Sequence, residues 1–228
     1  MKTQLLATVF ASALLAATPS LALAQQARPA ATTAHATTAQ PSAAARTVLD
    51  ASGRILATLE TRRGEFRGNP AALRNFIDGE MSRSFDRDYA ARLVLGVHGR
   101  GASDADIKLF ADAMADNLMA RYGSTLLDIQ GKPRFRYRSE AALPGNRGVK
   151  VSTELVRAGS EPTPVEYLMR EVGGQWKIFD VMIEGISYVQ TFKNQFDAPL
   201  RQKSIKDVAA ELRSGSLQAG AGPAPRGK

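Results

Sequence analysis

Asp180 and Glu184 are the two acidic residues whose spacing best suits chemistry, because they lie four positions apart across the end of a predicted strand. A carboxylate buried against a sheet can act as a general base, so one interpretation is an isomerase or dehydratase that acts on a small molecule. The other interpretation is structural: both carboxylates accept backbone N–H groups and orient the turn that follows the strand. These two residues alone leave both interpretations open.

The remaining residue patterns give little support to an enzyme. His35 lies in a low-complexity segment, and His98, beside Gly99, has no second ligand or base at a fixed spacing, which favours a loop or surface histidine. No serine lies in a GxSxG elbow, and the sequence has neither a glycine-rich phosphate loop nor an HExxH motif. The absence of cysteine excludes thiol catalysis and disulfides. On these patterns, the enzyme interpretation depends on Asp180 and Glu184 alone.

The strand that precedes Glu184 is apolar on both faces. Alternation predicts Trp176, Ile178 and Met182 on one face and Phe179, Val181 and Ile183 on the other. An antiparallel strand usually leaves one face to water, so this strand needs cover on both faces. The cover can be protein or a bound apolar ligand, and that alternative decides the function.

The elements around this strand predict an α+β domain. Apolar spacing and capping residues predict helices over 48–59, from Asn69, over 88–95 and from Ser103 through Leu118. Four strands follow at 132–138, 148–157, 164–172 and 175–183, and then helices begin at Gly185 and Ser204. The expected fold is a helical N-terminal half packed on an antiparallel sheet of about four strands, with helices at the C-terminal end.

The two ends of the chain have a different composition. Residues 1–24 resemble a signal peptide, with Lys2 before an apolar stretch at 5–16 that is too short to span a bilayer, and with small residues before Gln25. Residues 25–44 are predicted to be a disordered linker and 214–228 a disordered tail, since neither has enough apolar residues to fold. The folded domain is expected at 45–213, and the export signal predicts a location outside the cytoplasm.

The charge balance favours anionic partners. The formal net charge is +8, or +7 once Lys2 is removed, which also serves solubility. In 132–138, basic and aromatic residues alternate, a pattern that also occurs in strands that bind nucleic acid. Export argues against nucleic acid, so we expect the aromatic residues to point inward. The row Arg134, Arg136 and Arg138 then points outward, where solvent, lipid phosphates or an acidic partner surface remain alternatives.

Several segments together resemble the MlaC family, the periplasmic phospholipid-binding auxiliary component of the Mla lipid-transport system, also called the toluene-tolerance auxiliary component. They are ARLVLG at 91–96, ARYGSTLL at 120–127, WKIFDV at 176–181 and EGIS at 184–187. The resemblance covers most of 47–213, and EGIS after WKIFDV is its most specific part. The family implies a curved sheet with an apolar cavity between sheet and helices that encloses phospholipid tails.

The resemblance also implies what the protein does. Family members shuttle phospholipid by direct handover between an outer-membrane lipoprotein–porin complex and an inner-membrane ABC transporter with an MCE-domain subunit, which maintains outer-membrane lipid asymmetry. They use no metal and carry out no known reaction, so the resemblance implies no catalytic residue, no metal and no cofactor, and it favours the structural interpretation of Asp180 and Glu184. We therefore expect a monomeric periplasmic phospholipid carrier and no nucleic acid. Resemblance and strand geometry together predict that one cavity is surrounded by Tyr122, Val151, Tyr167, Phe179, Ile186 and Val189.

Overall fold

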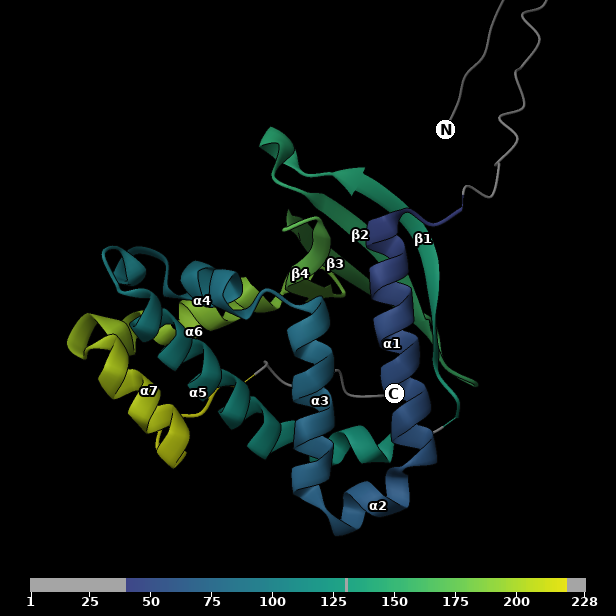
Figure 1. Ribbon diagram of the computed structural model, residues 1–228, viewed down its shortest axis with the longest axis horizontal. Coiled ribbons are helices and arrows are strands. Elements are labelled where there is room, and N and C mark those ends of the chain that lie inside the picture. The colour runs from purple at the N-terminus through teal and green to yellow at the C-terminus, as the bar shows by residue number, and fades with distance from the viewer. Residues whose placement is uncertain (1–39, 130, 221–228) are drawn as a thin grey trace, which may run out of the picture. The chain divides into compact units, whose positions relative to one another are not determined.

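The structure, a computed structural model, describes residues 40–129 and 131–220 (Figure 1). The predicted signal peptide at 1–24, residues 25–39 of the predicted linker and residues 221–228 of the predicted tail lie outside the described residues. All described residues belong to one unit.

Within the described residues, seven α-helices flank one five-stranded antiparallel sheet, which confirms the predicted α+β class. The helices are α1 (Ala43–Thr61), α2 (Arg63–Gly68), α3 (Pro70–Ser84), α4 (Arg87–Leu95), α5 (Asp104–Tyr122), α6 (Tyr188–Gln202) and α7 (Ile205–Ser214), and η1 (Gly96–Gly99) and η2 (Ser124–Asp128) are 3-10 turns. The strands are β1 (Arg134–Ala142), β2 (Val149–Val156), β3 (Thr163–Val172), β4 (Gln175–Ile183) and β5 (Ile186–Ser187). They lie in chain order β1-β2-β3-β4-β5.

The capping residues recognised in the sequence begin the helices that they predict. The side chain of Asn69 accepts the N–H of Ala72 and so caps α3, and Ser103 accepts the N–H of Asp106 and so caps α5. Ser204 and Asp207 form a reciprocal capping box at α7. These local interactions set where α3, α5 and α7 start.

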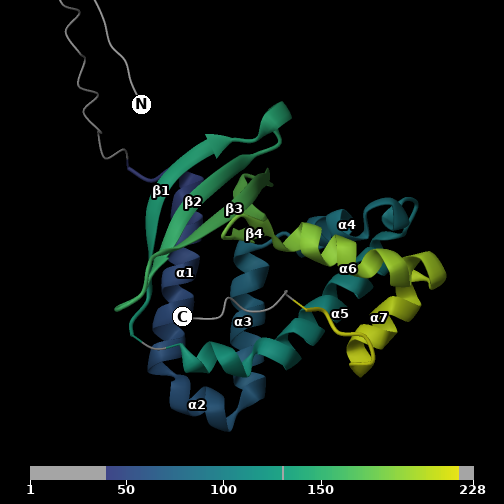
Figure 2. The same ribbon diagram turned by 180° about the vertical axis from the view of Figure 1, so that it is seen from behind.

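Helix α1 packs against one face of the curved sheet. Figure 1 shows the sheet bending around α1, with α3 beside α1. Ala45 and Val48 of α1 and Val151 and Met169 of the sheet are fully buried in this layer. Figure 2 shows that, in the part of the chain that the structure describes, no helix covers the opposite face of β1 and β2.

A second apolar layer is made by helices alone. Helices α4, α5, α6 and α7 gather beside the β4 end of the sheet (Figures 1 and 2). Phe110 of α5 and Phe196 of α6 are fully buried in it and meet edge to face at 5.5 Å between ring centroids. The described residues therefore have one core between α1 and the sheet, another among α4 to α7, and a small third cluster of Leu59, Phe66, Leu73 and Leu127. A functional site can form where the first two layers meet.

A β-bulge at Phe179 changes the predicted pattern of strand β4. Asp180 pairs with Leu168 and Ile178 pairs with Met169, so Phe179 is an extra residue without a partner in β3. The bulge shifts the alternation, and Val181 consequently packs with Ile178 against the α1 core instead of pointing to the face opposite Ile178. The predicted division of this strand into two alternating faces was therefore wrong beyond Ile178.

The chain after β4 makes a tight turn before it becomes helical. Glu184 and Gly185 have φ angles of 51° and 79°, as in a two-residue hairpin turn, and Ile183 pairs with Ile186 across it. The sequence predicted a helix from Gly185, but β5 forms first and α6 begins only at Tyr188. The turn first pairs Ile186 with Ile183 as a strand. The helix then begins after Ser187, whose side chain caps α6 by accepting the N–H of Gln190.

Both segments that the sequence predicted to be disordered include residues that are ordered in the structure. Helix α1 begins at Ala43, capped by Ser42, so the predicted linker overlaps its first two residues. At the other end, Ser214 closes α7, and Ala219 is completely buried against the helical core. This segment is ordered although it has few apolar residues, because side chains of α5 and α6 bind its backbone.

Asn117 of α5 and Gln195 of α6 hold the backbone that follows α7. Asn117 Nδ2 donates to the carbonyls of Leu212 and Leu217, at 2.6 and 3.1 Å, and Asn117 Oδ1 accepts the N–H of Ala219 at 2.9 Å. Gln195 donates to the carbonyl of Gln218 at 2.6 Å and accepts the N–H of Gly220 at 3.2 Å. Residues 217–220 therefore connect α5 to α6.

Replacing Asn117 by Ala should lower the free energy of unfolding by roughly 1–3 kcal/mol, because the substitution leaves buried backbone groups without partners. Urea unfolding followed by circular dichroism measures this difference. Asn194→Ala, at an exposed position of α6, is the control and should change the free energy of unfolding by less than about 0.5 kcal/mol. Equal stability of the two variants would contradict the role of residues 217–220 in the fold.

Candidate functional site

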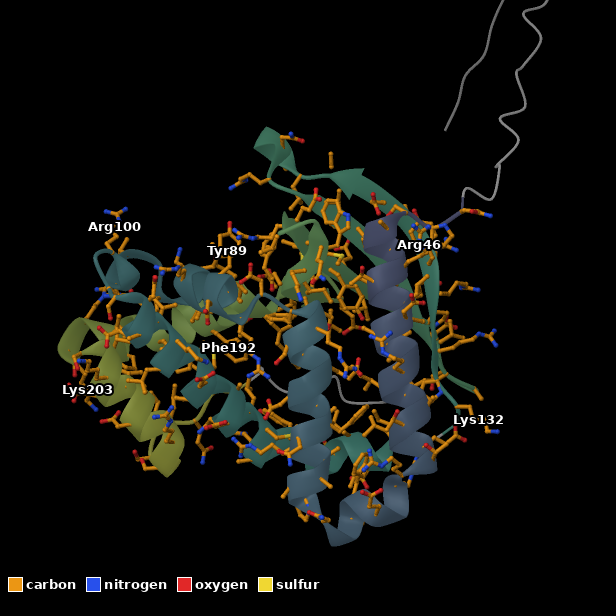
Figure 3. All side chains as sticks on the ribbon, viewed as in Figure 1. Arg46, Tyr89, Arg100, Lys132, Phe192 and Lys203 are labelled. Carbon is orange, nitrogen blue, oxygen red and sulfur yellow. The ribbon has the colours of Figure 1, made fainter. Side chains whose placement is uncertain are left out.

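An apolar cavity of about 320 Å³ lies where the two layers meet. Its walls come from α3, α4, α5 and α6 and from strand β4. The cavity therefore lies between sheet and helices, as predicted with the fold. Val94, Ala111, Leu118 and Phe192 are among the apolar side chains that face it. Figure 3 shows Phe192 among the helices, on the other side of α1 from Lys132.

Methionine is prominent in the cavity wall. Met81 of α3 and Met114 and Met119 of α5 line the cavity, and they are three of the six methionines in the chain. The methionine side chain is unbranched and polarizable, so it adapts to apolar partners of different shape. This wall is therefore suited to an apolar ligand whose length and conformation vary.

Two of the six predicted site residues lie in this wall. Tyr122, at the end of α5, and Val189, in the first turn of α6, both line the cavity. Val151 and Tyr167 instead belong to the core between α1 and the sheet, where burial raises the pKa of Tyr167 to about 12. These two side chains therefore point to the face of the sheet that packs on α1, and neither residue lines the cavity.

The other two predicted residues also lie elsewhere. The bulge directs Phe179 toward α4, where its ring meets Tyr89 edge to face at 5.2 Å. Ile186 is 61% exposed on β5 and is not among the residues that line the cavity. The six predicted residues therefore do not surround one cavity, because the alternation rule does not account for the bulge or for the turn at Glu184.

Sequence reasoning missed most of the cavity wall, although part of its signal was visible. Met114, Leu118 and Tyr122 are spaced four residues apart and so follow one face of α5. Ile107 and Phe110 continue this helical spacing toward the start of α5, but these two are fully buried in the helical core. One stripe thus serves two purposes along its length, and its spacing alone does not show where packing ends and the cavity begins.

Asp180 links the cavity wall to the start of α6. The residue is 4% exposed and lines the cavity, and its Oδ2 accepts the hydroxyl of Ser187 at 2.6 Å. Its Oδ1 accepts the N–H of Val189 at 3.0 Å. A carboxylate at the first turn of a helix is stabilised by such donors and by the helix dipole. The geometry matches the structural interpretation for Asp180, whereas Glu184 is exposed in the turn.

Two tyrosines add polar atoms to an otherwise apolar wall. Tyr122 and Tyr188 both line the cavity. The pKa of Tyr188 is raised first by burial and then by the nearby Tyr122. The Tyr188 phenol is therefore neutral at physiological pH, where it can donate a hydrogen bond without placing a charge in the cavity.

A charged pair also lies in the wall. Arg87 Nη2 is 2.7 Å from Asp78 Oδ1, which joins the start of α4 to α3. The side chains are 24% and 44% exposed, so both reach water while lining the cavity. These two side chains mark a partly hydrated part of the wall.

His98 has a partner that the sequence did not indicate. Its Nε2 lies 3.0 Å from Asp197 Oδ1, so the pair joins η1 to α6. The hydrogen bond from His98, followed by that from Arg201, lowers the pKa of Asp197. None of these three residues lines the cavity. The pair consequently supports the helical layer and does not add an acid or a base to the site.

The predicted basic row on β1 is partly paired, because one carboxylate, that of Glu154 on β2, meets two of its three arginines. Arg136 Nη2 lies 2.5 Å from Glu154 Oε2, and Arg138 Nε lies 3.3 Å from Glu154 Oε1. Lys150 and Glu166 form a further ion pair at 2.7 Å. The face of the sheet opposite α1 therefore carries alternating charges, which is typical of a solvated surface.

A larger hollow of about 770 Å³ runs between α1 on one side and Ile129 and residues 131–135 on the other. Glu60, Arg63, Lys132 and Arg134 contribute charged atoms to its lining. The smaller cavity beside β4 has the more apolar wall, and apolar walls with a few placed polar groups are typical of ligand sites. We therefore take the cavity beside β4 as the candidate site.

Comparisons with known proteins identify a family, a relative and a fold. The family model described as MlaC protein matches residues 49–214. The toluene tolerance protein ttg2D of Pseudomonas putida is 25% identical over 157 residues, which make up 68% of this chain and 71% of that protein. The phospholipid-binding protein from Ralstonia solanacearum, solved in complex with a phospholipid, is similar with a TM-score of 0.64 and 22% identity, over 75% of this chain and 95% of that chain. The structural similarity shows a shared fold.

Replacing Asp180 by Asn should lower the free energy of unfolding by roughly 1.5–3 kcal/mol, because the bonds from Ser187 and Val189 lose a charged acceptor. Urea unfolding measures the effect, and Asp50→Asn, on the exposed face of α1, serves as control. If Asp180→Asn unfolds at the same urea concentration as the control, Asp180 does not hold β4 to α6.

Proposed function

Because this chain belongs to the MlaC protein family, we propose that it is a periplasmic phospholipid carrier, which moves lipid between the outer and inner membranes and so maintains outer-membrane lipid asymmetry. The observation that carries the proposal is the apolar, methionine-rich cavity between β4 and the helices. The Ralstonia solanacearum protein of similar fold binds a phospholipid, and the same class of ligand suits an apolar wall. Tyr122 and Val189 are the predicted site residues that we expect to contact the lipid tails.

We infer from the size of the cavity that two lipid tails enter only when its walls move apart. The cavity of about 320 Å³ lies at the lower end of the range of roughly 300–1,000 Å³ that is typical of pockets for small ligands. Two acyl chains of a membrane phospholipid contain roughly thirty methylenes, so the walls have to separate to admit them. Because the walls belong to helices of two different layers, they can separate without breaking the core between α1 and the sheet.

The energetics of tail transfer favour direct handover. At about 0.8 kcal/mol per methylene, two chains of roughly fifteen methylenes represent on the order of 24 kcal/mol against exposure to water. Release into water is therefore very slow, and the carrier needs partners that offer another apolar cavity. We propose two partners, an inner-membrane ABC transporter complex with an MCE-domain subunit and an outer-membrane lipoprotein–porin complex. A monomeric carrier would bind to each of them in turn.

The proposed location rests on the sequence of the N-terminal end. Residues 1–24 have the composition of a secretory signal peptide. Among the residues that the structure describes, no helix is both long enough and apolar enough to cross a membrane. An exported carrier of this kind would work in the periplasm, between the two membranes.

The environment of Asp180 favours a carrier over the isomerase or dehydratase alternative. A general base needs a free oxygen directed at the substrate. Both oxygens of Asp180 accept hydrogen bonds, from Ser187 and from the backbone of Val189, and so serve the start of α6. We therefore propose that the cavity binds its ligand without transforming it.

Organic extraction of the protein, purified from its native source, followed by mass spectrometry tests the proposal directly. The expected result is phospholipid in the extract, in an amount comparable to the amount of protein. Protein from the native source that contains no phospholipid would contradict the carrier proposal.

Replacing Ala115 by Trp should then lower the phospholipid content roughly ten-fold or more, a difference of about 1.4 kcal/mol in binding, because the indole ring occupies the cavity that Ala115 lines. Two substitutions outside the lining serve as controls and should leave the lipid content unchanged: Ala105→Trp, at an exposed position of α5, and Ile186→Glu, on β5. Circular dichroism verifies that each variant is folded. A folded Ala115→Trp protein with a normal lipid content would place the ligand elsewhere.

A further inference from the structure

The ion pair in the cavity wall is positioned to meet the polar end of a ligand. Arg87 and Asp78 line the cavity and also reach water, whereas Asp180, the more deeply buried carboxylate, already accepts two hydrogen bonds. A ligand whose tails fill the apolar part of the cavity would have its polar group beside the partly exposed pair. The position therefore suits a headgroup better than a tail.

The surroundings of this pair are electrically balanced. Asp78 Oδ2 is 3.9 Å from Arg74 Nε, beyond hydrogen-bonding distance, while Arg74 donates to Asp116. The four side chains thus carry two positive and two negative charges. Asp78 retains capacity to accept a further donor, because a carboxylate has about four lone-pair sites.

Building on the proposed carrier function, we infer that Arg87 and Asp78 form a headgroup site for a zwitterionic phospholipid that carries a primary ammonium. The Arg87 guanidinium would bind the phosphate, since its fork of N–H donors matches phosphate oxygens. The Asp78 carboxylate would bind the ammonium. A partly exposed ion pair contributes little to stability, so opening it for the headgroup costs little.

An anionic headgroup fits the same pair less well. Phosphatidylglycerol offers Arg87 a phosphate, but it has no cation for Asp78, and the carboxylate then faces an anion at short range. Phosphatidylethanolamine supplies both charges. The site should therefore prefer phosphatidylethanolamine over phosphatidylglycerol by roughly two- to five-fold, as expected for partly exposed charge pairs.

The test measures which lipid the delipidated full-length protein takes up from vesicles of equal phosphatidylethanolamine and phosphatidylglycerol content. Mass spectrometry of the recovered protein gives both the total lipid and the ratio of the two headgroups. We expect the wild type to favour phosphatidylethanolamine, and this preference should shrink at high salt. Asp78→Asn should bring the ratio to that of the vesicles, because it lowers the uptake of phosphatidylethanolamine relative to phosphatidylglycerol, while Arg87→Gln should reduce the uptake of both lipids.

Arg121→Gln is the matched control. Arg121 lies over the ring of the cavity-lining Tyr122, at 5.4 Å from its centroid, but it does not itself line the cavity. The substitution removes the same charge as Arg87→Gln and should leave both the uptake and the ratio unchanged.

The outcomes separate this inference from the function on which it rests. Wild-type protein that takes up both lipids at the vesicle ratio, or an Asp78→Asn variant that keeps the wild-type preference, would overturn the headgroup site and leave the carrier intact. An equal effect of Arg121→Gln would likewise overturn it, in favour of a general effect of net charge. Wild-type protein that takes up neither lipid would overturn the carrier and the headgroup site together.

Discussion

The buried carboxylate of Asp180 is the interaction on which the position of the cavity depends. A carboxylate that is almost completely buried has to be compensated by donors, and here Ser187 and the N–H of Val189 provide them. The two bonds fix the start of α6 against β4, so the side chains of the first turns of α6 face the helices α3 and α5 across a gap. The cavity exists because one end of α6 is anchored to the sheet while its other end packs, through Phe196, in the helical layer.

This arrangement separates stability from binding. The core between α1 and the sheet contains Val48, Val151 and Met169, which have no exposed surface and belong to elements that do not line the cavity. The cavity wall uses methionines and residues at the edges of the helical layer. A ligand that separates the walls therefore disturbs few contacts of the α1 core, and the protein can combine a firm domain with an adaptable site.

Local chemistry explains which parts of this architecture were predictable from the sequence. The caps of α3, α5 and α7 depend on residues three positions apart, so Asn69, Ser103 and Ser204 correctly predicted where these helices begin. The bulge at Phe179 depends on pairing with β3, and the burial of Ala219 depends on Asn117, which lies about a hundred residues earlier. Interactions between such distant residues leave no periodic signal. Tyr122, at the end of α5, and Val189, just after the EGIS turn, are the predicted residues that line the cavity, whereas the rest of the wall forms only when the helices assemble.

The short segment after α7 acts as a tie between the two helices that it joins. Helix α5 supplies Met114 and Leu118 to the cavity and α6 supplies Phe192, while residues 217–220 are bound by Asn117 of one helix and Gln195 of the other. Any outward movement of α6 from α5 has to break these backbone bonds or carry the segment along. The amide hydrogens of Ala219 and Gly220 are consequently natural reporters of cavity opening. The rate at which these amides exchange with deuterated solvent would report how readily the wall opens, at positions that no ligand needs to touch.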